Sequence, residues 1–118
     1  MTINDRSGLR QLFQAYAPNT NAYSVFRKVA KRKVVLTCLN VVNSTNAAVT
    51  WSFFLDRDGT TYSAATALAY NQSLAANTSV QVTWGELGLP LDYGVAGNFA
   101  VQAGAANAIT YTGLGVEL

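Results

Sequence analysis

The sequence predicts an all-β fold: an antiparallel β-sandwich or jelly roll of seven or eight short strands with a short N-terminal arm or helical turn. Apolar and polar residues alternate over several short runs, which is the period of a strand with one buried face. Clusters of Asn, Asp, Ser, Thr and Gly separate these runs at short intervals, as turns do. Beyond residue 22, no stretch with helical spacing is long enough to change this class.

Residues 33–55 contain the two strongest strand-like runs and are expected to form a β-hairpin. The second run, residues 49–55, alternates and is predicted to be a half-buried strand. The first run, residues 33–42, is apolar at nearly every position, which favours a strand that is covered on both faces or faces a partner. The intervening Asn-Ser-Thr-Asn, residues 43–46, is expected to be the turn.

The remaining strands follow at similar intervals. They are expected at residues 23–27, 66–72, 79–84, 99–103 and 109–112, with a long turn over residues 85–97. The alternating positions of these strands predict a single core between two sheets. Its expected members are Val49, Trp51, Phe53, Val80, Val82, Phe99, Val101, Ile109 and Tyr111.

Residues 1–22 differ from the rest and are predicted to be an N-terminal arm that precedes a sandwich domain over residues 23–118. The arm has apolar residues at the i, i+3, i+4, i+7 spacing of one helical face, namely Leu9, Leu12, Phe13 and Tyr16. A helix of about eight residues is unstable alone in water, so it must dock on its own domain or on a neighbouring subunit. We expect the second, with these four residues as a protein-interaction site.

The chain of 118 residues is long enough for one domain with a core of its own. Only 12% of its residues are charged, against about 25% in an average soluble protein. Much of the surface is therefore left to uncharged polar side chains, which protect it weakly against association. A subunit covered by an assembly can have such a surface, and so can an extracytoplasmic β-sandwich.

The charges are distributed unevenly along the chain. The first 33 residues contain seven basic residues and one acidic residue, whereas the rest contains one basic and five acidic residues. A second protein-interaction site is predicted at the basic cluster Arg27, Lys28, Lys31, Arg32 and Lys33. It would meet an acidic surface of a protein partner and fix its register. Nucleic-acid binding and a solvated turn are the alternatives, and the cluster lacks the interleaved aromatic residues that stack on bases.

The sequence contains no pattern of catalytic residues. It has no histidine, which excludes a histidine-based triad, and its carboxylates form no recognisable pair. Residues 56–60 begin like a calcium loop but lack the later ligands, so a plain turn is expected there. We therefore expect no enzyme activity, cofactor or metal.

Two further expectations concern the single cysteine and the cell compartment. Cys38 lies in an apolar run and is predicted to be a small buried residue. The chain has neither a run of about 18 apolar residues nor an apolar signal-peptide core. No membrane association is expected, and the chain is expected to stay in the cytoplasm in which it is made or to leave it by lysis.

Four segments carry a resemblance to a known family: Tyr23–Phe26 with the apolar strand after it, residues 39–51, the turn at residues 73–78, and residues 105–118. Residues 23–118 resemble small β-sandwich proteins found among the virion proteins of tailed bacteriophages. The resemblance implies a virion structural protein without catalytic residues. Residues 6–16 and the basic cluster have no match in it.

The function that we expect from this resemblance is that of a capsid decoration protein, which binds and stabilises the assembled head of a phage. The implied partners are the major capsid protein or other virion proteins, and the implied location is the virion, after synthesis in the host bacterial cytoplasm. We expect a homo-oligomer, with a trimer as the first choice. A neck, tail or baseplate protein is the alternative within this class. A host-surface carbohydrate-binding module, with a site at Tyr62, Tyr70 and Tyr93, is the alternative of another class.

Overall fold

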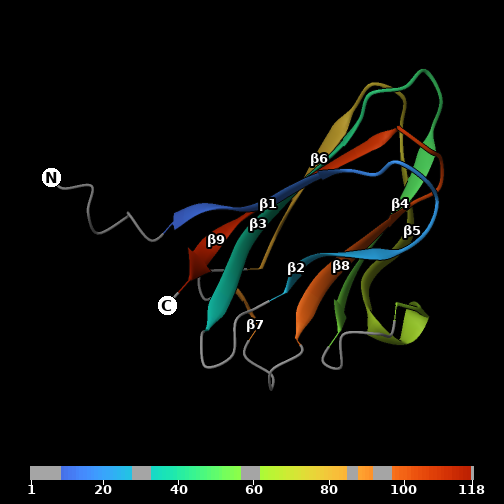
Figure 1. The fold of residues 1–118 in the computed structure, drawn as a ribbon. Coiled ribbons are helices and arrows are strands. Elements are labelled where there is room, and N and C mark those ends of the chain that lie inside the picture. Colours follow the sequence, from blue (N-terminus) through green and yellow to red (C-terminus); the bar gives the residue numbers. More distant parts are fainter. Residues whose placement is uncertain (1–8, 28–32, 57–61, 85–87, 92–96, 118) are drawn as a thin grey trace, which may run out of the picture.

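The computed structural model describes residues 9–27, 33–56, 62–84, 88–91 and 97–117, and they form two packed layers of antiparallel strands (Figure 1). The elements in this part of the chain are β1 (Leu9–Tyr16), β2 (Tyr23–Arg27), β3 (Val34–Asn43), β4 (Val49–Asp56), the 3-10 turn η2 (Ala64–Thr66), β5 (Ala67–Leu74), β6 (Ser79–Thr83), β7 (Leu89–Leu91), β8 (Asn98–Ala103) and β9 (Ile109–Glu117). The predicted all-β antiparallel sandwich is confirmed.

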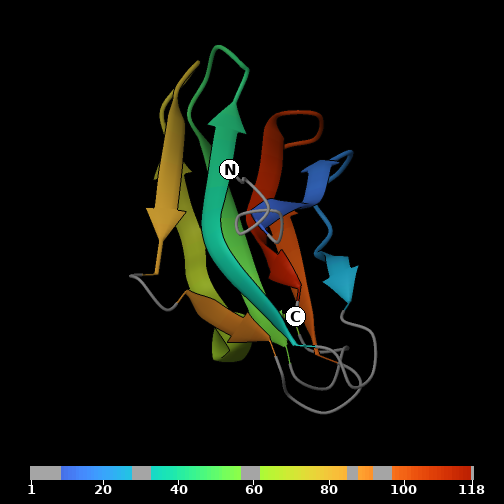
Figure 2. The same cartoon turned by 90° about the vertical axis from the view of Figure 1, so that its left-hand side faces the viewer.

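The strands divide into two sheets. Sheet A has the order β1-β9-β3-β6, and β7 also pairs with β3; sheet B has the order β2-β8-β4-β5. All strand pairs are antiparallel. The edge strands β1 and β2 lie along one side of the sandwich, and β5 and β6 lie along the other (Figure 2).

The predicted hairpin over residues 33–55 is wrong, because β3 belongs to sheet A and β4 to sheet B. Both runs are strands, but the connection between them crosses from one layer to the other. Each strand has a strongly apolar face, and Val41 of β3 and Phe53 of β4 are both buried in the common core. Placing the strands in opposite sheets directs both apolar faces into that core, whereas a hairpin would put them side by side in one layer.

The side chain of Asn43 holds this crossing in place. It is fully buried, and its Nδ2 donates hydrogen bonds to the carbonyl oxygens of Ala47 (2.8 Å), Leu74 (3.0 Å) and Ala75 (3.2 Å). Its Oδ1 accepts a hydrogen bond from the backbone N–H of Thr45 at 3.0 Å. One side chain therefore ties the β3–β4 connection to the end of β5.

The predicted core is confirmed. Seven of its nine predicted members are buried, and Val80 and Val82 are partly buried against the same cluster, since β6 is an edge strand. The rings of Phe53 and Phe99 stack at its centre with 5.4 Å between their centroids. The alternation of strand residues was therefore sufficient to identify the interior.

Tyr111 spans this core from one sheet to the other. It belongs to β9 in sheet A, and its hydroxyl donates a 2.6 Å hydrogen bond to the carbonyl oxygen of Gln102 in sheet B. Burial raises the pKa of the Tyr111 phenol above its ordinary value. The neutral, hydrogen-bonded phenol is thus the form that the fold favours.

The sequence analysis missed one strand, β7, and ended another, β9, too early. The short strand β7 lies within the predicted long turn of residues 85–97, where Leu91 is fully buried and pairs with Val34. Strand β9 continues to Glu117 rather than ending at residue 112. The residues of β9 beyond 112 pair with the first half of β1 in the N-terminal arm.

Candidate interaction surfaces

The predicted helical turn in the N-terminal arm is wrong, because residues 9–16 form the edge strand β1. This strand pairs with β9 from Leu9 opposite Val116 to Tyr16 opposite Thr110. Pairing with β9 gives one side of its backbone hydrogen-bond partners in the sheet, whereas an isolated helical turn of this length is unstable in water.

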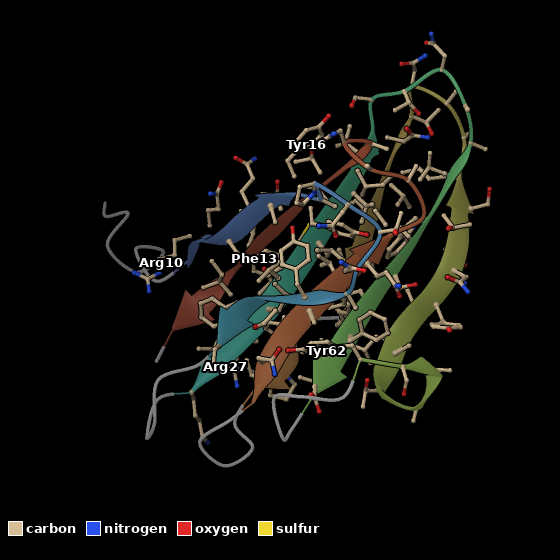
Figure 3. The ribbon with its side chains drawn as sticks, turned by 45° about the vertical axis from the view of Figure 1, so that its right-hand side comes forward. Arg10, Phe13, Tyr16, Arg27 and Tyr62 are labelled. Atoms are coloured by element: carbon tan, nitrogen blue, oxygen red, sulfur yellow. The ribbon has the colours of Figure 1, made fainter. Side chains whose placement is uncertain are left out.

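The arm residues therefore do not share one face. The pairing shifts between Gln11 and Phe13, so that Leu12 is partly buried and Phe13, at 7% exposure, points into the core. The Phe13 ring lies 6.5 Å from that of Phe26 on β2, and Figure 3 shows it directed toward this strand. Tyr16 is 51% exposed. Of these four predicted interaction residues, Tyr16 is the one shown to be available to a partner.

Glycines in β9 create the space for the arm. A Cβ atom on Gly113 would collide with the ring of Phe13, and one on Gly115 would collide with the carbonyl oxygen of Val35 on β3 and come within 2.8 Å of Leu12 Cδ1. Both arm side chains therefore lie where β9 has no side chains of its own. This complementarity explains why the arm packs on its own sandwich.

Hydrogen bonds fix the end of the arm. The backbone N–H of Ala17 donates to the carbonyl oxygen of Ile109, and the carbonyl oxygen of Ala17 accepts from the N–H of Asn107, both at 2.9 Å. The Tyr16 hydroxyl donates to the carbonyl oxygen of Asn107. The docking of this arm on a neighbouring subunit stays a prediction, and it would have to replace these contacts.

The basic cluster is described only at its two ends. Arg27 and Lys33 are exposed and flank residues 28–32, so Lys28, Lys31 and Arg32 lie outside the described residues. Arg10, also exposed, lies near the start of β1, and Figure 3 shows it with Arg27 toward the same end of the sandwich. Three basic side chains from β1, β2 and the start of β3 are thus gathered at one end.

The outer face of sheet A has no charged side chain over its centre. On each strand, the residues next to buried core positions point outward, and the strand pairing aligns them in rows such as Gln14–Thr112–Asn40–Gln81. We define this uncharged face of sheet A by Gln14, Tyr16, Cys38, Asn40, Val42, Ser79, Gln81, Thr83, Thr110, Thr112 and Leu114. It contains two exposed large apolar or aromatic side chains, Tyr16 and Val42.

Hydrogen bonds between neighbouring strands order this face. Gln14 Nε2 donates to Thr112 Oγ1 at 3.1 Å, and Gln81 Nε2 donates to Cys38 Sγ at 3.1 Å. Cys38 is buried at 8% exposure, as predicted. These two bonds restrain four of the uncharged side chains on this face, which lowers the conformational entropy that a partner would cost them on binding.

A second, smaller cluster lies on the outer face of sheet B. Phe54 points away from the core yet is fully buried, because the rings of Tyr62 (6.2 Å) and Tyr70 (6.4 Å) lie around it. The Tyr62 hydroxyl donates to Asn98 Oδ1 at 3.4 Å. The structure thus brings together two of the three tyrosines predicted for a carbohydrate site, while Tyr93 lies outside the described residues.

Within the described residues, no group of three His, Cys, Asp or Glu side chains could hold a metal ion. Of the segment that begins like a calcium loop, only Asp56 is described, and it is buried. None of the helical segments in the described ranges has the length and apolar character needed to cross a bilayer.

The comparisons with known proteins give a likeness of fold. No protein-family model matches the chain, and no curated protein sequence matches it. A chain of the infectious bursal disease virus particle superimposes with a TM-score of 0.52 at 10% identity, over 92% of this chain. The present chain spans only 29% of the length of that viral chain.

Two further solved structures are more distant. The infectious bursal disease virus Gx strain gives a TM-score of 0.47 at 12% identity, with 92% of this chain and 30% of the viral chain covered. The tobacco streak virus coat protein dimer gives 0.37 at 12% identity, with 92% and 81% covered. The first comparison shows that this sandwich fold also occurs in a chain of a virus particle.

Proposed function

We propose that this chain is a structural protein of a virus particle, and specifically a decoration protein that binds the assembled head of a tailed bacteriophage. The observation that carries the proposal is the uncharged, hydrogen-bonded outer face of sheet A on a sandwich of this fold. The likeness to a chain of the infectious bursal disease virus particle supports the broader role. The family resemblance of residues 23–118 supports the narrower one.

The uncharged face of sheet A suits a permanent protein contact. Charged residues are depleted at the centres of protein interfaces, where their desolvation is costly, and tyrosine is enriched there. This face has no charge and presents Tyr16. Several copies bound across the joints between coat subunits would stabilise the assembled shell by mass action and oppose the outward pressure of packaged DNA.

The end of the sandwich that carries three basic side chains, which we call the basic end, would set the orientation of this contact. Arg10, Arg27 and Lys33 would attract an acidic surface of the coat and fix the register of docking. A homo-oligomer, with a trimer as the first choice, is part of the proposal because closed symmetry lets identical subunits cover a shared surface.

Counting the protein in purified particles tests the proposal. Calibrated mass spectrometry should find on the order of hundreds of copies per particle for a shell protein, against roughly six or twelve for a neck or tail protein. Absence of the chain from purified particles would contradict a virion role altogether.

A matched pair of lysine variants tests the face itself. Gln81→Lys places a charge in the uncharged face of sheet A, whereas Thr20→Lys places the same charge on the exposed link between β1 and β2. Both should fold as the wild type does, and only Gln81→Lys should lose binding to particles that lack the protein. Equal binding of the two variants would show that the contact lies elsewhere.

Carbohydrate binding is the second candidate, and the tyrosines around Phe54 favour it. Aromatic rings stack on the apolar faces of sugars, and Tyr70 is 44% exposed. Screening the wild type and Tyr70→Ala against a glycan array separates this role from that of a decoration protein. Binding by the wild type alone would support the carbohydrate site, and no binding by either would reject it.

A further inference from the structure

Four connections between sheet A and sheet B contain no charged residue and consist only of Ala, Asn, Ser, Thr, Gly and one proline. They are residues 17–22, 44–48, 75–78 and 104–108. Figure 1 shows them at the end of the sandwich away from both chain termini, and we call this end the uncharged loop end. By contrast, the connection from β2 to β3, residues 28–33, contains four basic residues.

Backbone hydrogen bonds join these four connections to one another. The first and the fourth share the hydrogen bonds of Ala17. The N–H of Ser44 donates to the carbonyl oxygen of Ala108 at 3.1 Å, which links the second connection to the fourth. The N–H of Asn77 donates to the carbonyl oxygen of Thr45 at 3.0 Å, which links the third to the second. The uncharged loop end is therefore held in place before any ligand binds, which lowers the cost of ordering it.

A pocket of about 390 Å³ opens where the second and third connections meet. Its lining comes from the end of β3, the start of β6 and the connections next to them: Val42, Asn43, Ser44, Asn77, Thr78 and Ser79. Ligand pockets in proteins have volumes from about 300 Å³ upward. This pocket is thus large enough for a small molecule or for one unit of a longer chain molecule.

The lining offers hydrogen-bonding groups without charge. Ser79 is exposed, and its hydroxyl makes no hydrogen bond to the described residues. Asn77 is also exposed; its Nδ2 donates to Asn46 Oδ1 at 3.3 Å, while its Oδ1 has no partner in the described part of the chain. Val42, at 39% exposure, pairs with Ser79 across β3 and β6 and adds an apolar surface. A hydroxyl and an amide oxygen are therefore available beside one aliphatic side chain.

This composition selects against most classes of ligand. An ion entering the pocket would lose hydration without meeting an opposite charge, since neither the lining nor the four connections carry one. A largely apolar ligand would contact Val42 but would leave the polar groups of the lining without partners. A neutral sugar has hydroxyls that donate and accept hydrogen bonds, together with apolar C–H faces, so it matches both parts of the lining.

We propose that this pocket binds one unit of an uncharged glycan, with sugar hydroxyls bonded to Ser79 and Asn77 and a C–H face against Val42. The ring of Tyr16 lies on the same row of outward-pointing residues, Tyr16–Thr110–Val42–Ser79. Two strand spacings, about 10 Å, separate β1 from β3. A further unit of an oligosaccharide therefore reaches this ring, which is 51% exposed.

The glycan site does not rest on the proposed role in the virion. Val42, Ser79 and Tyr16 also belong to the uncharged face of sheet A, so a coat subunit that covered them would compete with the glycan. Glycan binding is therefore measured on the free protein and coat binding on particles. Failure of either measurement leaves the other proposal standing.

NMR titration of the ¹⁵N-labelled full chain tests the class of ligand. The probes are three neutral trisaccharides, namely maltotriose, mannotriose and chitotriose, and the acidic trigalacturonate, each added up to about 20 mM. At least one neutral trisaccharide should shift the backbone amides of Ser44, Asn77, Ser79 and Tyr16, with a Kd on the order of 1 mM because the contacts are few. Trigalacturonate should leave these amides unchanged, since the pocket has no charge to pair with its carboxylates.

A matched pair of leucine variants locates the site. Ser79→Leu fills the pocket and removes its hydroxyl, whereas Thr83→Leu introduces the same side chain on the same face of β6, four residues or about 13 Å away. Both positions are exposed, so both variants should fold as the wild type does. Ser79→Leu should weaken binding roughly tenfold or more, because a hydrogen bond is lost and its space is filled. Thr83→Leu should bind as the wild type does.

Four results would overturn the proposal. They are unchanged pocket amides with all three neutral trisaccharides, equally tight binding of trigalacturonate, and an equal loss of binding in Ser79→Leu and Thr83→Leu. The fourth is a set of shifts confined to Tyr70 and its neighbours, which would assign glycan binding to the tyrosine cluster on sheet B instead.

Discussion

The ring of Phe13 occupies the space that a side chain on Gly113 would need. The two residues are paired across β1 and β9, at the point where the register of the arm shifts. A glycine on the inner strand thus admits an aromatic ring from the edge strand into the core. This pairing is the reason that the N-terminal arm is part of the sandwich.

The substitution Gly113→Ala should therefore displace Phe13 and lower the free energy of unfolding by about 1–3 kcal/mol, the cost of overpacking. Phe13→Ala removes a buried ring and should cost about 3–5 kcal/mol. In the double variant the alanine at position 113 has nothing to displace, so the two losses should not add. Chemical denaturation of the four proteins gives the coupling directly, and strictly additive losses would contradict the proposed collision.

Deleting residues 1–17 should destabilise the isolated protein strongly, because it removes β1 and exposes the rings of Phe26 and Phe99 that Phe13 covers. Loss of one buried aromatic ring alone costs about 3–5 kcal/mol. Thermal unfolding of the truncated chain measures the effect. An unchanged midpoint would mean that the arm is held elsewhere, for example on a neighbouring subunit.

Asn43 should be among the most sensitive polar residues. Asn43→Ala leaves three carbonyl oxygens without their donor and should lower stability by about 2–4 kcal/mol. Asn46→Ala, on the same connection but exposed, should change stability by about 0.5 kcal/mol or less. Similar losses in the two variants would show that the buried amide does not hold the crossing.

Tyr111 should make the free energy of unfolding fall at alkaline pH. Because burial raises its folded pKa above the ordinary 10.0, its stabilising effect is complete below that pH and is lost as pH rises toward the folded pKa. Tyr111→Phe should cost about 1–3 kcal/mol at neutral pH and should lessen this alkaline loss. Urea unfolding of both proteins between neutral pH and pH of about 11 tests it; parallel curves would contradict the assignment.

The fold class and the core were predictable from the sequence because both depend on local alternation. Val49, Trp51 and Phe53 point to one side whatever strand lies next to them. The layer to which β4 belongs is not local, since a short polar connection joins strands within one sheet and across two sheets equally well. The buried amide of Asn43 distinguishes the two cases, and its partners on β5 and beyond lie more than 30 positions away in the chain.

The arm was predicted wrongly for a related reason. Apolar residues at positions 9, 12, 13 and 16 match a helical face, yet a strand with one register shift accommodates them as well. The deciding partner is Gly113 of β9, about 100 residues later. The uncharged face of sheet A was equally hidden, because the row from Gln14 to Gln81 joins four strands that are distant in sequence.

A density map of the purified particle, at a resolution that separates strands, tests the central claim most directly. We expect many copies of this sandwich on the head, with the uncharged face of sheet A buried against neighbouring coat subunits and the basic end over an acidic surface. A particle on which no such sandwich is found, or on which that face points into solvent in every copy, would contradict the account.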